Sequence, residues 1–246
     1  MSLVSDIHGN PARIEDWAIR MHDVCGQLDE FAVIILGDAG FNYYLNKTDK
    51  KTKNRIEQLW GLTVYCVRGN HEQRPSLLAD IHTVYDEDTQ GLVYTEYEWP
   101  HIKYFQDGNE YWLGQYRTLI IGGAYSVDKE YRLVNHWQWF EQEQLSQEEM
   151  DKISLYAGQH FDLVLSHTCP LSWEPTDLFL KQVDQSTVDN SMEIWMEDFK
   201  DKISWTAWAF GHFHVDRMLL RFSNRVRIFY EDIEELKYFI ERAKNQ

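Results

Sequence analysis

The stretch "VRGNHEQRP", Val67–Pro75, decides how the rest of the chain is interpreted. It follows the apolar run "LTVYCV" at 62–67, a pattern that predicts a buried strand. A turn after a strand needs residues such as Gly69 and Asn70, but it does not need a histidine beside a carboxylate. The polar side chains at this point therefore indicate chemistry, and the same pattern recurs elsewhere in the chain.

Five apolar runs of the sequence end in short polar motifs. These motifs, with the residues that carry them, are "SDIHGN" (Asp6, His8), "LGDAG" (Asp38), "RGNHE" (Asn70, His71), "LSHT" (His167) and "FGHFH" (His212, His214). In α/β sheets, ligands bind outside the carboxyl ends of the strands. We therefore expect these side chains to gather at one edge of a sheet.

The residue types in these loops suit divalent metal ions. Histidine nitrogens combined with carboxylate and amide oxygens, without a thiolate, are typical of zinc, iron or manganese sites. Asp6 and His8 are two residues apart, as are His212 and His214, so each pair lies on one face of an extended segment. Asp38 has two carboxylate oxygens and could bridge two ions. Two-metal sites of this kind serve displacement reactions at phosphorus.

Composition bounds the fold and the classes of partner. The chain has 246 residues, of which 43% are hydrophobic and 15% aromatic, enough for one large domain with a substantial core. The formal charge of −16, from 40 acidic and 24 basic residues, argues against nucleic acid as a partner. It still permits a small phosphorylated substrate at a locally positive site.

Neither a membrane segment nor a secretion signal is expected. No apolar run approaches the length of a membrane span, and the start "MSLVSDIHGN" lacks a basic segment followed by an apolar one. The three cysteines, Cys25, Cys66 and Cys169, are odd in number and form no CxxC motif, which favours a reducing compartment. We expect a cytoplasmic protein whose oligomeric state stays open.

The order of strand and helix patterns predicts an α/β fold. The first third alternates apolar strands with helical segments at 10–24 and 46–60, which predicts parallel pairing. Residues 92–125 are aromatic and β-branched runs interrupted by turns such as Asp107-Gly108-Asn109, which predicts antiparallel hairpins. Residues 136–160 return to a helical pattern. The runs "RMLLRF" and "VRIFY" suggest a final hairpin.

The five motifs taken together resemble the calcineurin-like metallophosphoesterase superfamily. In chain order they read D-x-H, G-D, G-N-H-E, H and G-H-x-H, and they run from Asp6 to His214. The resemblance implies an α/β fold of two packed mixed β-sheets flanked by helices, as a single domain over residues 1–246. Segments between the motifs are expected to form helical insertions that cover the site and set the choice of substrate, near 41–60, 127–160 and 176–203.

The resemblance also implies a dinuclear centre of Mn, Fe or Zn. One ion would be held by Asp6, His8, Asp38 and His214. The other would be held by Asp38, Asn70, His167 and His212, with Asp38 as the bridge. A hydroxide bridging the ions would attack phosphorus in line, and His71 would protonate the leaving oxygen or stabilise charge there. Glu72 would support or orient the site.

The run "RGNHE" is similar to the phosphoprotein phosphatase branch, in which an arginine at the position of Arg68 binds phosphate oxygens. A guanidinium fork suits the terminal oxygens of a monoester, so a small phosphomonoester or a phosphopeptide is the expected substrate. The chain departs from that branch after Asp38, where "GDAGFNYY" has Phe41 and Asn42 in place of an aspartate and an arginine. This departure argues against a Ser/Thr protein phosphatase and leaves the metal ligands intact.

Other functions stay open beside the phosphomonoesterase. The enzyme alternative is a phosphodiesterase or a (di)nucleotide polyphosphate hydrolase. A non-catalytic scaffold of the same fold is the third hypothesis, disfavoured because every expected ligand position is occupied. The run "IIGGAYSVDKEYR", with Tyr125, Asp128 and Arg132, could line the pocket, since its two glycines permit close backbone approach. An ordinary strand-to-loop turn is the favoured interpretation of that run.

Overall fold

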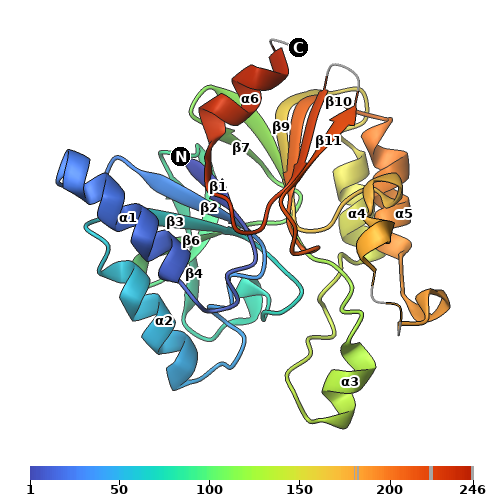
Figure 1. Ribbon diagram of the computed structural model, residues 1–246, viewed down its shortest axis with the longest axis horizontal. Coiled ribbons are helices and arrows are strands. Elements are labelled where there is room, and N and C mark those ends of the chain that lie inside the picture. Colours follow the sequence, from blue (N-terminus) through green and yellow to red (C-terminus); the bar gives the residue numbers. More distant parts are fainter. Residues whose placement is uncertain (180, 182, 222–223, 245–246) are drawn as a thin grey trace.

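A computed structural model describes residues 1–179, 181, 183–221 and 224–244. Two mixed β-sheets pack face to face, with helices on their outer faces (Figure 1). The predicted fold class, α/β with two packed mixed sheets flanked by helices, is confirmed. Among the described residues, no helix combines the length and apolar character that crossing a membrane requires.

The first sheet has seven strands in the spatial order β13-β1-β2-β3-β6-β5-β4. Strands β1, β2, β3 and β6 are parallel neighbours, and the strands outside them pair antiparallel. The predicted parallel arrangement of the first three strands is thus confirmed. The bounds are β1 Ser2–Val4, β2 Ala32–Leu36, β3 Thr63–Val67, β4 Ile81–Asp86, β5 Gly91–Glu96, β6 Trp99–Phe105 and β13 Glu234–Glu235.

The second sheet has six strands in the spatial order β11-β12-β10-β9-β8-β7. Its four central strands are parallel, and the edge strands β7 and β11 each form an antiparallel hairpin with a neighbour. The bounds are β7 Glu110–Leu113, β8 Tyr116–Ile121, β9 His160–Ser166, β10 Ser204–Phe210, β11 Arg217–Arg221 and β12 Asn224–Ile228. The hairpin of β11 and β12 confirms the predicted final hairpin as far as its residues are described.

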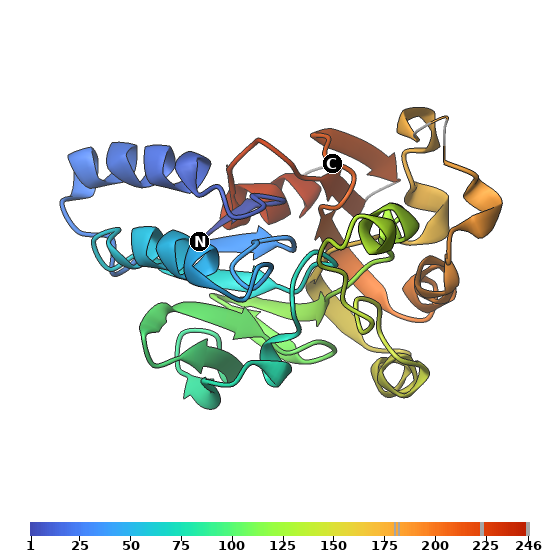
Figure 2. The same cartoon turned by 90° about the horizontal axis from the view of Figure 1, so that it is seen from below.

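The helices form the outer layers of the fold. Helices α1 and α2 pack on the outer face of the first sheet, and α4 and α5 pack on that of the second, as Figure 2 shows from below. Helix α3 lies outside these layers, at the end of a long connection from β8 (Figure 1). The bounds are α1 Ala12–Cys25, α2 Lys47–Glu57, α3 Lys129–Val134, α4 Gln147–Ser154, α5 Ser191–Lys200 and α6 Leu236–Lys244.

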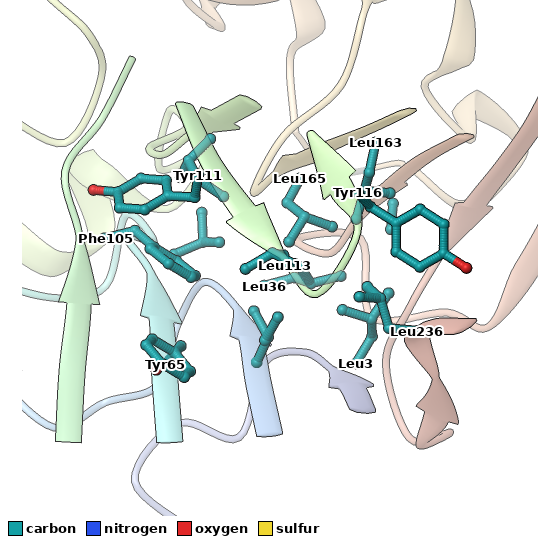
Figure 3. Packing of buried hydrophobic residues seen from close by; sticks show 14 of the residues in the cluster. Leu3, Leu36, Tyr65, Phe105, Tyr111, Leu113, Tyr116, Leu163, Leu165 and Leu236 are labelled. Carbon is teal, nitrogen blue, oxygen red and sulfur yellow. The ribbon is translucent and has the colours of Figure 1, made fainter. Parts of the chain in front are cut away.

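The main core lies between the two sheets. Leu36 and Tyr65 from the first sheet meet Leu113 and Leu165 from the second, and all four are almost fully buried (Figure 3). The central strands are buried on both faces, which explains why they read as continuous apolar runs. Helix α6, which the sequence patterns did not indicate, contributes Leu236, Phe239 and Ile240 to this core.

The turn at Asp107–Asn109 has a different role from the one predicted. It connects β6 with β7, and these two strands belong to different sheets. The predicted hairpins are present, one formed by β5 and β6 and the other by β7 and β8. Strand β4, which no sequence pattern indicates, pairs antiparallel with β5. The turn therefore passes the chain from one sheet to the other.

The helical prediction for residues 136–160 is only partly correct. The one helix in that range, α4, starts after Ser146, which forms a capping box with Glu149. The residues just before α4 are irregular because two arginines that follow β3 bind their main-chain carbonyl groups. Arg68 donates to the carbonyl oxygen of Glu143, and Arg74 donates to that of Gln144. In the segment 176–203, short 3₁₀ turns at Thr176–Leu178 and Gln185–Thr187 precede α5.

Candidate metal centre

The five polar motifs follow the carboxyl ends of β1, β2 and β3 in one sheet and of β9 and β10 in the other. Hydrogen bonds between the sheets bring these ends together. The His212 backbone N–H donates to Asp6 Oδ2 at 2.9 Å, and His167 Nδ1 lies 2.8 Å from the Leu36 carbonyl oxygen. The expectation that the motifs gather at one place is confirmed, with the qualification that two sheets supply them.

The backbone at the predicted ligands is unusual. Nine described non-glycine residues have positive φ, and five of them are predicted ligands, with φ between 45° and 69°. They are Asp6, His8, Asp38, His212 and His214. This left-handed conformation is costly for a side chain with a Cβ, and it tends to persist at functional sites where the surroundings enforce it.

Close packing of the loops depends on glycines in front of the ligands. A Cβ on Gly69 would lie 2.0 Å from Asp38 Oδ1, and a Cβ on Gly37 would lie 2.0 Å from His167 Nδ1. Only glycine allows the main chain to come so near these side chains. The Gly-Asp and Gly-Asn pairs of the motifs are therefore a steric requirement of the site.

One group of potential ligands is formed by Asp6, His8 and His214. The Nε2 atoms of His8 and His214 are 3.0 Å apart, and His214 Nε2 lies 3.4 Å from Asp6 Oδ1. Asp38 Oδ2 lies 3.8 Å from His8 Nε2. These are the four residues predicted to hold the first ion, and the structure brings them together.

The second group centres on His167. Its Nε2 lies 2.9 Å from Asn70 Oδ1 and 3.6 Å from Asp38 Oδ1. Asp38 thus directs one oxygen toward each group, as a bridging carboxylate would. The fourth predicted ligand, His212, has its ring 5.0 Å from that of His167. It lies outside the three His/Asp groups whose ligand atoms all fall within 4.8 Å of one another, at least among the described residues.

The residues present fit divalent metal ions. The three groups are Asp6 with His8 and His214, His8 with Asp38 and His71, and Asp6 with Asp38 and His167. Asp6 and Asp38 are each only 2% exposed, and Asp6 Oδ1 is buried without a hydrogen-bond partner in the described part of the chain. A buried carboxylate oxygen with no donor is expensive unless a cation binds it. The same geometry admits His71 as a ligand, whereas we predicted a role at the leaving oxygen.

The electrostatics of the site call for positive charge between the carboxylates. Burial alone would raise the pKa of Asp38, but the neighbouring His167 and His71 hold it well below its ordinary value. Burial would lower the pKa of His167, yet Asp38 and Asp6 raise it to about 9. Burial and the adjacent His167 lower the pKa of His212 to about 3, so its ring is neutral and able to bind a metal.

Asn70 is held by residues that the sequence interpretation missed. Its Nδ2 donates to Ser126 Oγ at 2.9 Å, and Ser126 Oγ donates to Glu143 Oε2 at 2.5 Å. This chain fixes the amide so that Oδ1 faces His167. Partners of this kind commonly orient metal ligands. The Gly-Gly pair at 122–123 was the available signal, because a Cβ on Gly123 would lie 2.4 Å from the Glu143 carbonyl oxygen.

Glu72 is buried behind the same loop. Its Oε1 accepts a hydrogen bond from the Gly69 backbone N–H at 2.8 Å, and no described residue donates to Oε2. Burial, followed by the charge of Asp38, raises the pKa of Glu72 to about 7. In this position Glu72 holds the turn that presents Asn70 and His71.

His71 lies between two cavities and against Arg132. One cavity, of about 400 Å³, is lined by Asp38, Asn70, His71, Asp128 and residues of the segment 174–193; the other, of about 180 Å³, includes His8, Tyr43 and Arg132. Arg132 Nη2 lies 3.0 Å from His71 Nδ1. Asp128 and Tyr125 line the larger cavity, so the ordinary-turn interpretation of that run is replaced by a place in the site wall.

Arg68 is placed away from both cavities. It is 3% exposed, its Nε donates to Asp107 Oδ2 at 2.6 Å, and its Nη1 donates to the Glu143 carbonyl at 2.6 Å. Its Nη2 donates to the Gly122 carbonyl at 3.2 Å. This geometry argues against the predicted contact between Arg68 and phosphate, because the guanidinium is buried and already bound on every nitrogen.

Comparison with known proteins agrees with the geometry of the site. No curated protein matches the chain. The sequence model of one family, described as calcineurin-like phosphoesterase, matches residues 3–216, which include all five motifs. The family implies divalent metal binding and hydrolysis of phosphoric esters, in agreement with the clustered aspartates and histidines. The chain therefore belongs to the calcineurin-like phosphoesterase family.

Proposed function

We propose that the protein is a metal-dependent phosphomonoesterase that acts on a small phosphorylated molecule or a phosphopeptide. The observation that carries this proposal is the position of Arg132, whose guanidinium lies beside His71 at the wall of the site. A monoester has more unsubstituted, charged oxygens than a diester, so it gains more from a guanidinium. The proposal gives Arg132 the role that the sequence had suggested for Arg68.

The contacts of Arg132 leave one nitrogen facing the site. Its Nε donates to Asp128 Oδ1 at 2.7 Å, and its Nη1 donates to Tyr43 Oη at 2.8 Å. Nη2 faces His71, with 3.0 Å to Nδ1 and 3.2 Å to Nε2. The guanidinium is therefore held in place before a substrate arrives, which reduces the entropy lost on binding.

The predicted metal ligands and His71 would share the remaining work. When bound, the two ions would supply activation of water and withdrawal of charge from the phosphoryl oxygens. Asp38 would contribute one oxygen to each ligand group, in keeping with its distances to His8 and His167. His71, which lines both cavities, would hydrogen-bond or protonate the leaving oxygen.

A phosphodiesterase is the second candidate, and the two cavities favour it. They meet at His71, so the two ester groups of a diester would each have a space to occupy. A polyphosphate hydrolase has less support, because the described lining of the larger cavity includes no lysine or arginine. Such a substrate needs several cations beyond the metal centre.

The test compares p-nitrophenyl phosphate with bis-p-nitrophenyl phosphate, using metal-stripped protein with and without added Mn. We expect Mn-dependent hydrolysis that is faster for the monoester. In Arg132→Ala, we expect kcat/KM for the monoester to fall by about tenfold to a hundredfold, because a charge-assisted contact is worth roughly 1.5–3 kcal/mol. The loss on the diester should be smaller.

Arg117→Ala serves as the matched control. Arg117 also pairs with a carboxylate, Glu110, but lies on β8 outside both cavities. Faster cleavage of the diester, or an equal loss on both substrates in Arg132→Ala, would shift the assignment to a phosphodiesterase. If the protein bound no Mn and cleaved neither substrate, both the phosphomonoesterase and the phosphodiesterase assignments would be wrong. The hypothesis of a non-catalytic scaffold would then be favoured.

A further inference from the structure

The larger cavity extends from the predicted metal ligands to an apolar wall. Its polar lining includes Asp38, Asn70, His71, His212 and His214. Its apolar lining consists of Leu178, Phe179, Val183, Val188 and Phe213, and the ring of Phe213 lies 5.0 Å from that of His212. The rings of Phe179 and Phe213 are nearly parallel, at 14°, with centroids 6.4 Å apart. A phosphoryl group at the metal ligands would therefore direct the rest of its molecule toward apolar and aromatic side chains.

Two carboxyl groups that are not predicted metal ligands, those of Glu193 and Glu174, also line this cavity. Glu193, on α5, is 4% exposed, and its Oε1 accepts a hydrogen bond from Thr168 Oγ1 at 2.7 Å. Its Oε2 is buried and has no hydrogen-bond partner among the residues that the structure describes. A buried carboxylate oxygen without a donor is unfavourable, so this wall is incomplete without a ligand that donates hydrogen bonds.

No described side chain compensates this acidity. Among the described lining residues there is no lysine and no arginine, and the histidines are predicted metal ligands or His71. Burial raises the pKa values of both Glu174 and Glu193 to about 7, which is the response of carboxyl groups that lack a cation. Apolar and aromatic walls with acidic groups at one end form an environment that suits an organic cation.

We propose that this cavity is a leaving-group site for an aromatic or aliphatic group that carries a protonated amine. The amine would donate hydrogen bonds to Glu193 Oε2 and lie near Glu174, while the apolar body packs against Phe179 and Phe213. The inference rests on the proposed phosphoesterase function, since it assigns the part of the substrate that leaves with the ester oxygen. It also disfavours anionic leaving groups, including those of nucleotides.

Binding can be measured without turnover. The probes are tyramine, 4-ethylphenol and 3-(4-hydroxyphenyl)propionate, which share a phenol and differ in the charge of the tail. Calorimetry with Mn-loaded protein should show tyramine binding at least about tenfold tighter than 4-ethylphenol, as expected for a charge-assisted hydrogen bond to a buried carboxylate. The propionate should bind most weakly.

Turnover of the matching phosphate monoesters then locates the amine site relative to the metal centre. The three leaving phenols have similar basicity, so differences in kcat/KM report contacts of the tail. We expect kcat/KM to be highest for the ammonium ester, lower by about tenfold for the ethyl ester, and lowest for the carboxylate ester. In Glu193→Gln the advantage of the ammonium ester over the ethyl ester should fall to nearly one.

Asp198→Asn is the matched control on the same helix. The Asp198 side chain is 78% exposed, pairs with Lys202 at 3.2 Å and does not line either cavity among the described residues, so this variant should keep the preference for the ammonium ester. Glu174→Gln provides a second test if Glu193→Gln does not fold, and it should reduce the same preference.

The outcomes separate this inference from the proposed function. Equal binding of tyramine and 4-ethylphenol, or tyramine binding that Glu193→Gln leaves unchanged, would overturn the amine site even in an active phosphatase. Absence of Mn-dependent hydrolysis together with selective tyramine binding would instead overturn the phosphoesterase assignment and retain the amine site. Hydrolysis of all three esters at one rate would show that the cavity does not hold the leaving group.

Discussion

The two sides of the site differ in how the chain builds them. The side with the predicted metal ligands consists of residues that directly follow β1, β2, β3, β9 and β10. The rest of the lining includes Arg132, on α3 at the smaller cavity, together with Glu174 and Glu193, in a connection and on α5 at the larger cavity. A side chain at a strand end is positioned by the hydrogen bonds of the sheet. A side chain in a connection is positioned by contacts with distant parts of the folded chain.

The two arginines Arg68 and Arg132 show what this difference means. Arg68 lies in the motif that resembles a phosphate-binding sequence, yet its guanidinium is bound to Asp107 and to main-chain carbonyls. Arg132 lies in a run that reads as an ordinary turn, yet it contacts His71. The position of an arginine in a motif determines where its Cα lies. The residues around its guanidinium determine which N–H groups remain available to a substrate.

The largest effect is expected at the strand-end side, in His71→Ala. Because His71 lines both cavities and touches Arg132, its removal should lower kcat by about two to four orders of magnitude, the range of general acid catalysis. Metal content, measured by mass spectrometry, should stay at the wild-type value. His160→Ala is the control, since His160 begins β9 at the end opposite to the site. Loss of one ion in His71→Ala would make His71 a ligand and end its assignment to the leaving oxygen.

Much of the strand-end side was predictable from sequence because its signal is local. Each ligand stands within a few residues of an apolar strand, and Gly37 and Gly69 mark the close approaches. Ser126 and Glu143 are far from Asn70 in the sequence, and the residues that flank them in the sequence do not indicate that they contact it. The same holds for the irregular residues before α4, where Arg68 and Arg74 bind the carbonyl groups of Glu143 and Gln144, within the range 136–160 that the pattern assigned to a helix.

Arg68→Ala tests whether Arg68 is structural. Its side chain is 2% exposed and that of Asp107 is 10% exposed, so removing the arginine takes the closest cation from an almost buried carboxylate. Asp107 would keep the Gly122 backbone N–H at 3.0 Å and the more distant Arg74, at 3.9 Å. Breaking such a pair typically lowers the free energy of unfolding by about 3–5 kcal/mol. Urea unfolding should show a loss in that range, with kcat/KM per folded molecule changed much less than in Arg132→Ala.

A surface pair provides the comparison for that variant. Arg55 is 41% exposed and pairs with Glu15, so Arg55→Ala should cost no more than about 1 kcal/mol. If Arg68→Ala proved as stable as Arg55→Ala but lost monoester turnover, the phosphate role of Arg68 would be restored, and the contrast between the two arginines would fail.

The smallest effect on stability is expected at Arg74, which, like Arg68, binds main-chain carbonyl groups of the segment before α4. Its ion pair with Glu149 and the Ser146 backbone N–H outweigh the effect of burial and lower the pKa of Glu149 from 4.5 to about 2. A lowered pKa in the folded state gives stability that is present above pH 4.5 and is lost as the pH falls through 2. Glu149→Gln should therefore cost about 1 kcal/mol at pH 6, and the difference from wild type should shrink between pH 4.5 and 2.

Urea unfolding at a series of pH values measures this difference directly. Glu148→Gln is the matched control, because Glu148 precedes it on α4 and pairs with Lys152 while both side chains are mostly exposed. That variant should show little loss at pH 6 and little change with pH. A difference between Glu149→Gln and wild type that stays constant down to pH 2.5 would mean that the charge of Glu149 is irrelevant to the anchor. The capping box alone would then hold the start of α4, and Arg74 would contribute through its bonds to the main-chain carbonyls of Gln142 and Gln144.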